Sequence, residues 1–295
     1  MSHPSKIALQ TVDMTRFNCL ALSVADGVAT VTLDHPPINL LDAQMLDELE
    51  AVADRIEGDS AIKVLVLQSA DPDFFLAHAD ISYYFNNGRR LSGGPVPRPV
   101  EPTRAQALLE RFRRMPKATI AKVEGRVRGG ASCLVLAIDM CFAATGKATF
   151  GHPEIALGLL PAIGGSQRLP RRTGRARALE IILGGDTISA EVAERYGYIN
   201  RALAPDELGP FVDRLAARIA SYSAHAIALA KRAVDAAEAL PLSEGLLEEA
   251  YCFDQASASP EALRRMARYL EGGQQREFEL KMCGFVRKLA TGGAA

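Results

Sequence analysis

The residue types best suited to chemistry gather between residues 123 and 171. One glycine pair, Gly129-Gly130, precedes an apolar run, a second, Gly164-Gly165, precedes a basic segment, and Glu154 lies between them. Glycine lets a backbone N–H group come close to a ligand, because it has no side chain to block the approach. A carboxylate can take up and return a proton. The stretch therefore predicts a site in which backbone donors and one acid act together.

Glu154 stands in a Gly-His-Pro-Glu turn, where Pro153 fixes the backbone just before the acid. A carboxylate beside an apolar pocket holds its proton more tightly than one in water, which suits general acid–base catalysis. The alternative is a carboxylate that caps a nearby turn. His152, two residues earlier, is a candidate for modulating the acid.

The backbone donors also have two interpretations. Gly129-Gly130 either points N–H groups at a ligand or only allows a strand and a helix to pack closely. A second loop, DPDFFLAHADI at residues 71–81, places the small Ala77 after two aromatic residues, and Asp80 there could cap a following helix. Small residues at the end of a buried strand allow backbone amides to approach a ligand.

The elements around these residues follow from hydrophobic periodicity and turn signals. Asp26-Gly27 between two apolar runs predicts a hairpin, and the VLVL run at 64–67 predicts a strand buried on both faces. The spacing predicts strands over residues 19–24, 28–33, 64–67, 118–123 and 141–144, with a further one beginning at 149. It predicts helices over residues 42–55, 103–115, 131–138, 175–183, 189–196, 206–221, 225–239, 242–256 and 260–270.

This order predicts an α/β fold with an all-helical C-terminal region. Residues 1–17 are expected to be a loose tail, 18–200 the core and 201–295 the helical region. Residues 88–102 are rich in glycine, proline and arginine, a composition that predicts a mobile loop or lid.

Composition limits the classes of function. The chain has 295 residues and a net charge of −1, from 34 basic and 35 acidic side chains, so we expect no affinity for nucleic acid or an anionic membrane. Five cysteines without paired spacing predict reduced thiols, a cytoplasmic location and no metal site. No apolar run is long enough for a membrane span or a signal peptide.

Four segments in order carry a resemblance to a known family. These are FFLAHADI (74–81), EGRVRGGAS (124–132), FGHPEIALGLLPAIGGSQRLPR (150–171) and ISAEVAERYGYINRALAPDEL (188–208). Over roughly residues 18–235 the chain resembles the enoyl-CoA hydratase/isomerase (crotonase) superfamily. The resemblance implies a spiral of ββα turns with a C-terminal helical trimerisation region. It also implies an acyl-CoA substrate, no cofactor, and a homotrimer or a dimer of trimers.

The resemblance also implies roles for individual residues. Ala77 and Gly130 match the two backbone donors that stabilise a thioester enolate, and Glu154 matches a catalytic acid. The neighbouring positions expected to contact the substrate are His78, Ala79, Asp80, Ile81, Cys133 and Leu157. The Arg168–Arg177 segment, Lys231 and Arg232 are candidates for contacts with the CoA phosphates, although basic runs are also typical of solvated helix faces.

Cys133 departs from the pattern, because the two-acid hydratases have glutamate there. A thiol cannot simply replace a carboxylate that orients water. We expect a small buried residue; a nucleophile is the alternative, although no nucleophile elbow surrounds it and no partner histidine is evident. An enoyl-CoA hydratase or isomerase with one acid is therefore the leading hypothesis. A scaffolding relative that binds CoA without catalysis and a single-acid acyl-CoA hydrolase are the alternatives.

Overall fold

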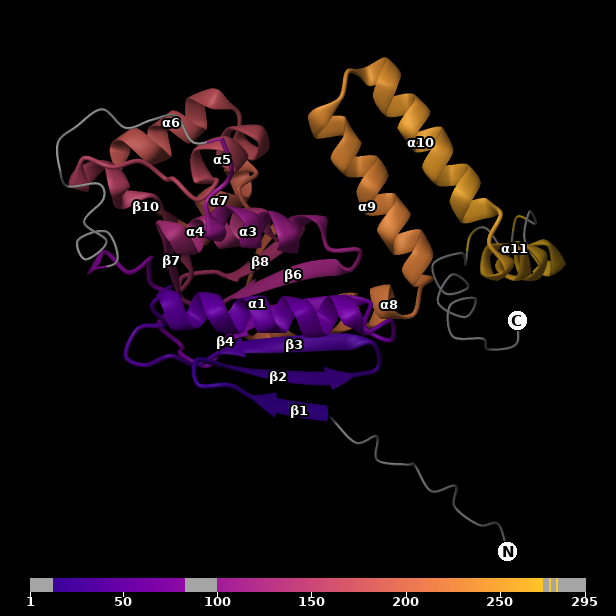
Figure 1. Ribbon diagram of the computed structural model, residues 1–295, viewed down its shortest axis with the longest axis horizontal. Coiled ribbons are helices and arrows are strands. Elements are labelled where there is room, and N and C mark those ends of the chain that lie inside the picture. The colour runs from indigo at the N-terminus through magenta and orange to yellow at the C-terminus, as the bar shows by residue number, and fades with distance from the viewer. Residues whose placement is uncertain (1–12, 83–99, 273–275, 277–279, 281–295) are drawn as a thin grey trace, which may run out of the picture.

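The computed structural model describes residues 13–82, 100–272, 276 and 280, and its strands form two mixed sheets (Figure 1). The larger sheet has seven strands in the order β1-β2-β3-β4-β6-β8-β11, and the smaller has four in the order β10-β9-β7-β5. The strands of the larger sheet are β1 (Asp13–Arg16), β2 (Leu20–Ala25), β3 (Val28–Leu33), β4 (Val64–Ser69), β6 (Ala118–Val123), β8 (Met140–Ala144) and β11 (Arg201–Leu203). Those of the smaller are β5 (Phe74–Leu76), β7 (Arg126–Arg128), β9 (Thr149–Gly151) and β10 (Thr187–Ser189).

The strands repeat in pairs along the chain. β4, β6 and β8 lie in parallel in the larger sheet, and each is followed directly by a strand of the smaller one: β5, β7 and β9. Those followers also lie in parallel with one another, and each pair leads on into helical structure. This is the predicted spiral of ββα turns. It collects the loops that leave β5, β7 and β9 at one edge of the smaller sheet.

The N-terminal hairpin is confirmed and extends further than expected. Asp26 and Gly27 both have positive φ, 50° and 78°, which suits a tight turn between antiparallel β2 and β3. The prediction of a loose tail to residue 17 is wrong for Asp13–Arg16, which form β1 and pair with β2. An edge strand needs only backbone partners, so apolar periodicity did not mark it. Residues 1–12 lie outside the described part.

The helices cover both faces of the larger sheet. They are α1 (Ala43–Gly58), α3 (Arg104–Arg114), α4 (Gly130–Ala137), the 3₁₀ helix η1 (Pro153–Leu157), α5 (Gly165–Thr173), α6 (Arg175–Gly184), α7 (Ala190–Tyr196), α8 (Pro205–Ala220), α9 (Ala224–Ala239), α10 (Leu242–Ser257) and α11 (Pro260–Gly272). Alternate residues of β4 face opposite ways: Leu65 and Leu67 join the main core with α1, α3 and α4. Val64 and Val66 join a second core beneath α8, as expected for a strand buried on both faces.

The sequence does not predict helix α5, because Pro170 lies inside it and the apolar periodicity begins only at Arg175. The predicted lid at residues 88–102 falls almost entirely on residues 83–99, outside the described part. Thr103 caps α3 through a capping box with Gln106, at the predicted start of that helix.

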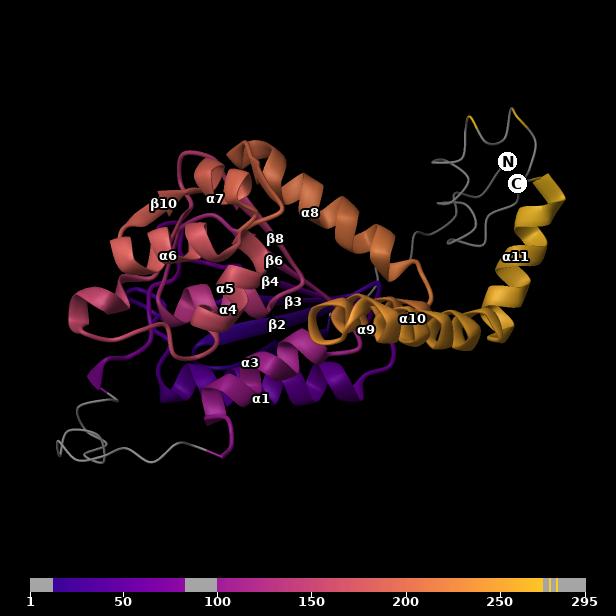
Figure 2. The same cartoon turned by 90° about the horizontal axis from the view of Figure 1, so that it is seen from above.

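The C-terminal helices α9, α10 and α11 extend away from the sheets (Figures 1 and 2). Much of their apolar surface is uncovered; exposed members include Val234, Leu242, Leu246, Leu247, Tyr251, Phe253, Leu263 and Met266. Within the described residues, none of the helices is long and apolar enough to cross a membrane.

Candidate active site

The turn between β7 and α4 is the centre of the site. Gly129 has φ 54°, and its N–H donates to the Gly151 carbonyl at 2.9 Å. A Cβ at position 129 would lie 3.2 Å from Glu154 Oε1, and one at position 130 would lie 2.8 Å from the Ala79 Cβ. Glycines are needed here because the acid and the loop after β5 both press against this turn.

The structure corrects one of the two predicted donors. The N–H of Ala77 donates to the Asn39 carbonyl at 3.0 Å, and the residue is 3% exposed, so this group is already used by the fold. Two residues on, the loop pairs with Leu41 through the His78 carbonyl and the Asp80 N–H. Among the hydrogen bonds of the described residues, none uses the N–H of Ala79 or of Gly130.

Ala79 and Gly130 are also neighbours in space. The Ala79 nitrogen lies 3.4 Å from the point where a Cβ on Gly130 would stand. Gly130 is the first residue of α4, where the helix dipole favours negative charge. The sequence could not show that the Ala77 N–H is used inside the fold, because hydrophobicity does not reveal which N–H groups a loop uses internally.

Glu154 lies on η1, and its side chain is 17% exposed. Its two carboxylate oxygens differ in their surroundings. Oε1 faces the Gly129 turn, whereas Oε2 is buried and has no hydrogen-bond partner. Oε1 is thus the carboxylate oxygen nearer to the Gly129 turn. An acid or base that serves a molecule at this turn would use that oxygen.

His152 is fully buried beside the acid, which the sequence proposed only as a possibility. Its Nδ1 lies 3.7 Å from Glu154 Oε2 and has no hydrogen-bond partner. Its Nε2 lies 3.5 Å from the hydroxyl of Tyr198, a residue that sequence reasoning did not single out. Tyr198 follows α7 and also contacts Phe150 on β9, with ring centroids 5.2 Å apart. Only the tertiary fold brings these rings together.

Cys133 is buried on α4, as predicted. Burial and then the negative charge of Glu154 raise the pKa of its thiol to about 12, so it is protonated at neutral pH and a poor nucleophile. Its surroundings are tightly packed. A Cβ on Gly165 would lie 2.7 Å from Cys133 Sγ and 2.9 Å from His152 Cε1. The prediction that no partner histidine is available is wrong, because His152 lies nearby.

Cys133, His152 and Glu154 offer one ligand atom each within 4.8 Å of one another. Thiolate, imidazole and carboxylate are donor types found in zinc sites. The sequence predicted no metal site, because the three residues follow no metal-binding spacing. Use of Cys133 as a ligand would require loss of its proton.

The other predicted binding residues lie around the same loop and helix. His78 Nδ1 lies 3.0 Å from the Ala79 carbonyl, and Asp80 accepts hydrogen bonds from the Ser82 N–H and hydroxyl. Ile81, on the loop after β5, and Leu157, at the end of η1, are exposed apolar residues. Asp80 stabilises the loop itself.

The basic residues proposed for phosphate contacts have partners within the chain. Arg168 pairs with Glu110 at 2.8 Å, Lys231 pairs with Asp139 at 2.8 Å, and Arg232 pairs with Glu248 on α10. Arg172 is largely buried and donates to the Ile138 carbonyl at 2.5 Å. Desolvation lowers its pKa. The structure thus gives these side chains a role in packing α5 and α9 against the core.

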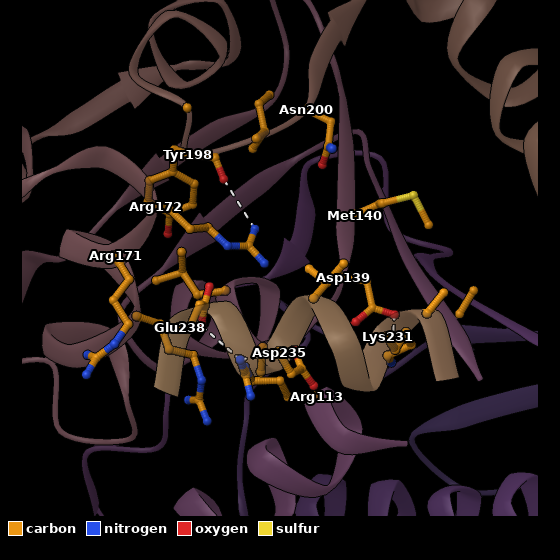
Figure 3. Close-up of a pocket in the computed structure, with 18 residues that line it drawn as sticks. Arg113, Asp139, Met140, Arg171, Arg172, Tyr198, Asn200, Lys231, Asp235 and Glu238 are labelled. Atoms are coloured by element: carbon orange, nitrogen blue, oxygen red, sulfur yellow. Dashed lines mark hydrogen bonds and ion pairs between the residues drawn. The ribbon is translucent and has the colours of Figure 1, made fainter. Parts of the chain in front are cut away.

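Several of these residues line a cavity of about 470 Å³ between α9 and the core (Figure 3). Arg113 crosses it to Asp235 at 3.1 Å and to Glu238 at 2.8 Å. Opposite charges therefore compensate one another across the cavity. Glu154 is not among the residues that line it.

Comparisons with known proteins identify the family of the chain. The sequence profile of the family described as enoyl-CoA hydratase/isomerase matches residues 23–279. The chain is 30% identical to a crotonyl-CoA hydratase of Syntrophomonas wolfei, covering 85% of this chain and 95% of the relative. It is 31% identical to a short-chain-enoyl-CoA hydratase of Clostridium acetobutylicum, covering 86% and 95%.

A solved structure gives the same result for the fold. The enoyl-CoA hydratase structure from Geobacillus kaustophilus superposes with a TM-score of 0.82 at 29% identity, covering 90% of this chain and 98% of that one. Its similarity extends over the sheets and the helices that follow them. The chain therefore belongs to the enoyl-CoA hydratase/isomerase (crotonase) family, whose members are lyases and isomerases.

Proposed function

We propose that this enzyme acts on an acyl-CoA thioester, holding the thioester oxygen with the N–H groups of Ala79 and Gly130 while Glu154 transfers a proton. One observation carries the proposal: the Gly129-Gly130 turn touches both Glu154 Oε1 and the Ala79 loop. The N–H groups of Ala79 and Gly130, which have no hydrogen-bond partner among the described residues, and one carboxylate oxygen thus lie around the same turn. Ala79 is proposed as the first N–H donor, the role that the sequence prediction gave to Ala77.

The chemistry accounts for this arrangement. Removal of a proton next to a thioester carbonyl, or addition of water to its conjugated double bond, places negative charge on the carbonyl oxygen. Preorganised amides stabilise that charge, and loss of one donor of such a pair costs roughly 2.7–4 kcal/mol of transition-state stabilisation. The position of Gly130 at the start of α4 adds the helix dipole to the same effect.

Cys133 bears on which reaction follows. Because its pKa is raised to about 12, its thiol offers no ionised second group at neutral pH. Isomerisation of a double bond needs only one carboxylate, which moves a proton between two carbons, whereas two-acid hydration also needs a group that orients water. One-acid chemistry is therefore what this site supports best. Hydrolysis of the thioester and loss of catalysis in a CoA-binding scaffold are the alternatives.

The test is the variant Glu154→Gln with a panel of 2-enoyl-CoA and 3-enoyl-CoA substrates. We expect it to abolish turnover and to leave binding of the CoA ester nearly unchanged, because the amide keeps the shape but cannot take up a proton. Turnover by hydration or isomerisation is followed separately. If the unsubstituted protein binds CoA esters but converts none of them, the scaffold interpretation replaces this one.

We also propose that the enzyme assembles as a homotrimer, or as a dimer of trimers, through its C-terminal helices. The uncovered apolar side chains of α9–α11 support this proposal. An apolar surface of this kind is typical of an interaction site.

A further inference from the structure

His152 is the group that meets the rear oxygen of Glu154. The carboxylate has an Oε1 that faces the Gly129 turn and an Oε2 that is buried without a partner. The only other orphaned atom beside it among the described residues is His152 Nδ1, 3.7 Å away. Two complementary buried atoms therefore face each other at a distance slightly too long for a hydrogen bond.

The other ring nitrogen of His152 lies near a second buried side chain. His152 is fully buried, and Tyr198 places its hydroxyl 3.5 Å from Nε2. Tyr198 is also fully buried, and it packs on Phe150. When the tyrosine hydroxyl donates to Nε2, the ring carries its proton on Nδ1, where it faces Glu154. Hydrogen bonds at catalytic groups are often long in the free enzyme and shorten when substrate binds.

We propose that His152 is a positioning residue for Glu154: its Nδ1–H holds Oε2 and thereby orients Oε1 toward the substrate. The proposal rests on the proposed function, because it assigns a role to Glu154 in proton transfer. The histidine does not touch the substrate, since it is fully buried behind the carboxylate. Tyr198 fixes the tautomer that makes the donation possible.

The other groups that face this pair do not offer the same donor. Cys133 on α4 is a protonated thiol whose partners are the backbone of Gly165 and Ile163. Arg168 on α5 is paired with Glu110 at 2.8 Å. Ser132 on α4 donates to the Gly151 carbonyl at 2.8 Å. His152 is therefore the side chain available to hold the rear oxygen.

The experiment compares His152→Asn, His152→Gln and His152→Leu in the full-length protein, in the presence of EDTA to exclude metal binding. Asparagine places an amide N–H near the position of Nδ1, glutamine places its amide further out near Nε2, and leucine offers no donor. The measurements are kcat and KM with the acyl-CoA that the enzyme converts. Thermal unfolding checks that each variant is folded, and Tyr198→Phe tests the residue behind the ring.

We expect leucine to lower kcat by up to about a hundredfold with little change in KM, because a displaced acid still leaves the binding groups intact. A fall in kcat without a matching rise in KM separates a misplaced acid from a damaged binding site. Asparagine should restore most of kcat, glutamine less. Tyr198→Phe should show the same changes as leucine, reduced in size.

Two results would overturn the proposal. In the first, the leucine variant retains the kcat of the unsubstituted enzyme. In the second, asparagine is no better than glutamine, which would mean that side-chain volume and not the donor matters. If the leucine variant does not fold, comparing the kcat of the asparagine and glutamine variants still tests the proposal. If Glu154→Gln is inactive and His152→Leu is unaffected, only the positioning role of His152 is refuted. If Glu154→Gln is active, the proposed function itself is refuted.

Discussion

At the scale of single residues, Cys133 shows how environment decides chemistry. It is a thiol within 4.8 Å of a histidine and a carboxylate, which on composition alone resembles a catalytic cluster. Its raised pKa of about 12 and complete burial argue against that role. A thiolate is the reactive form, so the surroundings keep this residue inert.

We therefore predict that Cys133 resists alkylation. In the folded enzyme, iodoacetamide at pH 8 should leave the peptide that contains Cys133 unmodified and the activity unchanged, and denatured protein should be labelled at the same residue. Mass spectrometry of the digested protein measures both. Rapid labelling of the folded protein would contradict this account of the site.

The sequence was sufficient for some residues and not for others. Turn chemistry marks the positions of Glu154 and Gly130 in the sequence, and the structure places Glu154 Oε1 beside Gly129, the neighbour of Gly130. The N–H of Ala77, which the sequence proposed as a donor, bonds to the Asn39 carbonyl, because hydrogen bonding inside a loop leaves no trace in composition. The contact of His152 with Tyr198 joins residues 46 positions apart, and no local pattern encodes it.

At the scale of elements, the close approach of the β5 loop to α4 explains the glycine at position 130. We predict that Gly130→Ala abolishes most turnover, because the new methyl group would lie 2.8 Å from the Ala79 Cβ and push the two donors apart. Circular dichroism should show the same secondary structure as in the unsubstituted protein. The matched control is Gly58→Ala at the end of α1, where a Cβ meets nothing within 4 Å. Normal activity of Gly130→Ala would contradict the convergence of the two donors.

The first turn of α1 gives a prediction with a defined pH dependence. Asp42 caps this helix by accepting from the Met45 N–H at 2.8 Å, and it pairs with His35 at 2.8 Å. Burial alone would raise its pKa, but these contacts outweigh burial and hold the pKa below 3.8. The stabilisation by the carboxylate is therefore complete above pH 3.8 and is lost as the pH falls through the lowered pKa.

Asp42→Ala should lower the free energy of unfolding at pH 7 by about 1 kcal/mol, the usual contribution of a helix N-cap. Urea denaturation at several pH values measures the difference between the two proteins. The difference should shrink as the pH falls through the lowered pKa of Asp42, because the stabilising carboxylate is then protonated. A difference that grows in acid would show that the carboxylate is not the stabilising form.

Some helices and strands could be predicted from the sequence and others could not. Helices α1, α3 and α4 and the strands β2, β3, β4, β6 and β8 were predicted, because each has a clear apolar face or a continuous buried run. Strand β1 and helix α5 were not predicted: the first is held by pairing with β2, and the second contains a proline. Both are cases in which tertiary contacts outweigh local preference.

For the molecule as a whole, the exposed apolar surface of the C-terminal helices supports the proposed assembly and makes it testable. On α10, Leu247 is 73% exposed and Phe253 is 70% exposed, although side chains of this size are mostly buried in a stable fold. We expect the double variant Leu247→Glu/Phe253→Glu to lower the mass of the particle in light scattering from that of a trimer or hexamer to that of a monomer. Unchanged circular dichroism would show that the helices persist, and an unchanged mass would contradict assembly through α10.

The crowding at Gly165 limits the routes by which this site can evolve. A methyl group at that position would meet both Cys133 and His152, so the three positions share a fixed volume. We expect a carboxylate at position 133 to be accepted only in a chain that has already exchanged His152 for a less bulky residue. A two-acid enzyme could then arise from this one only if the substitution of His152 came before that of Cys133.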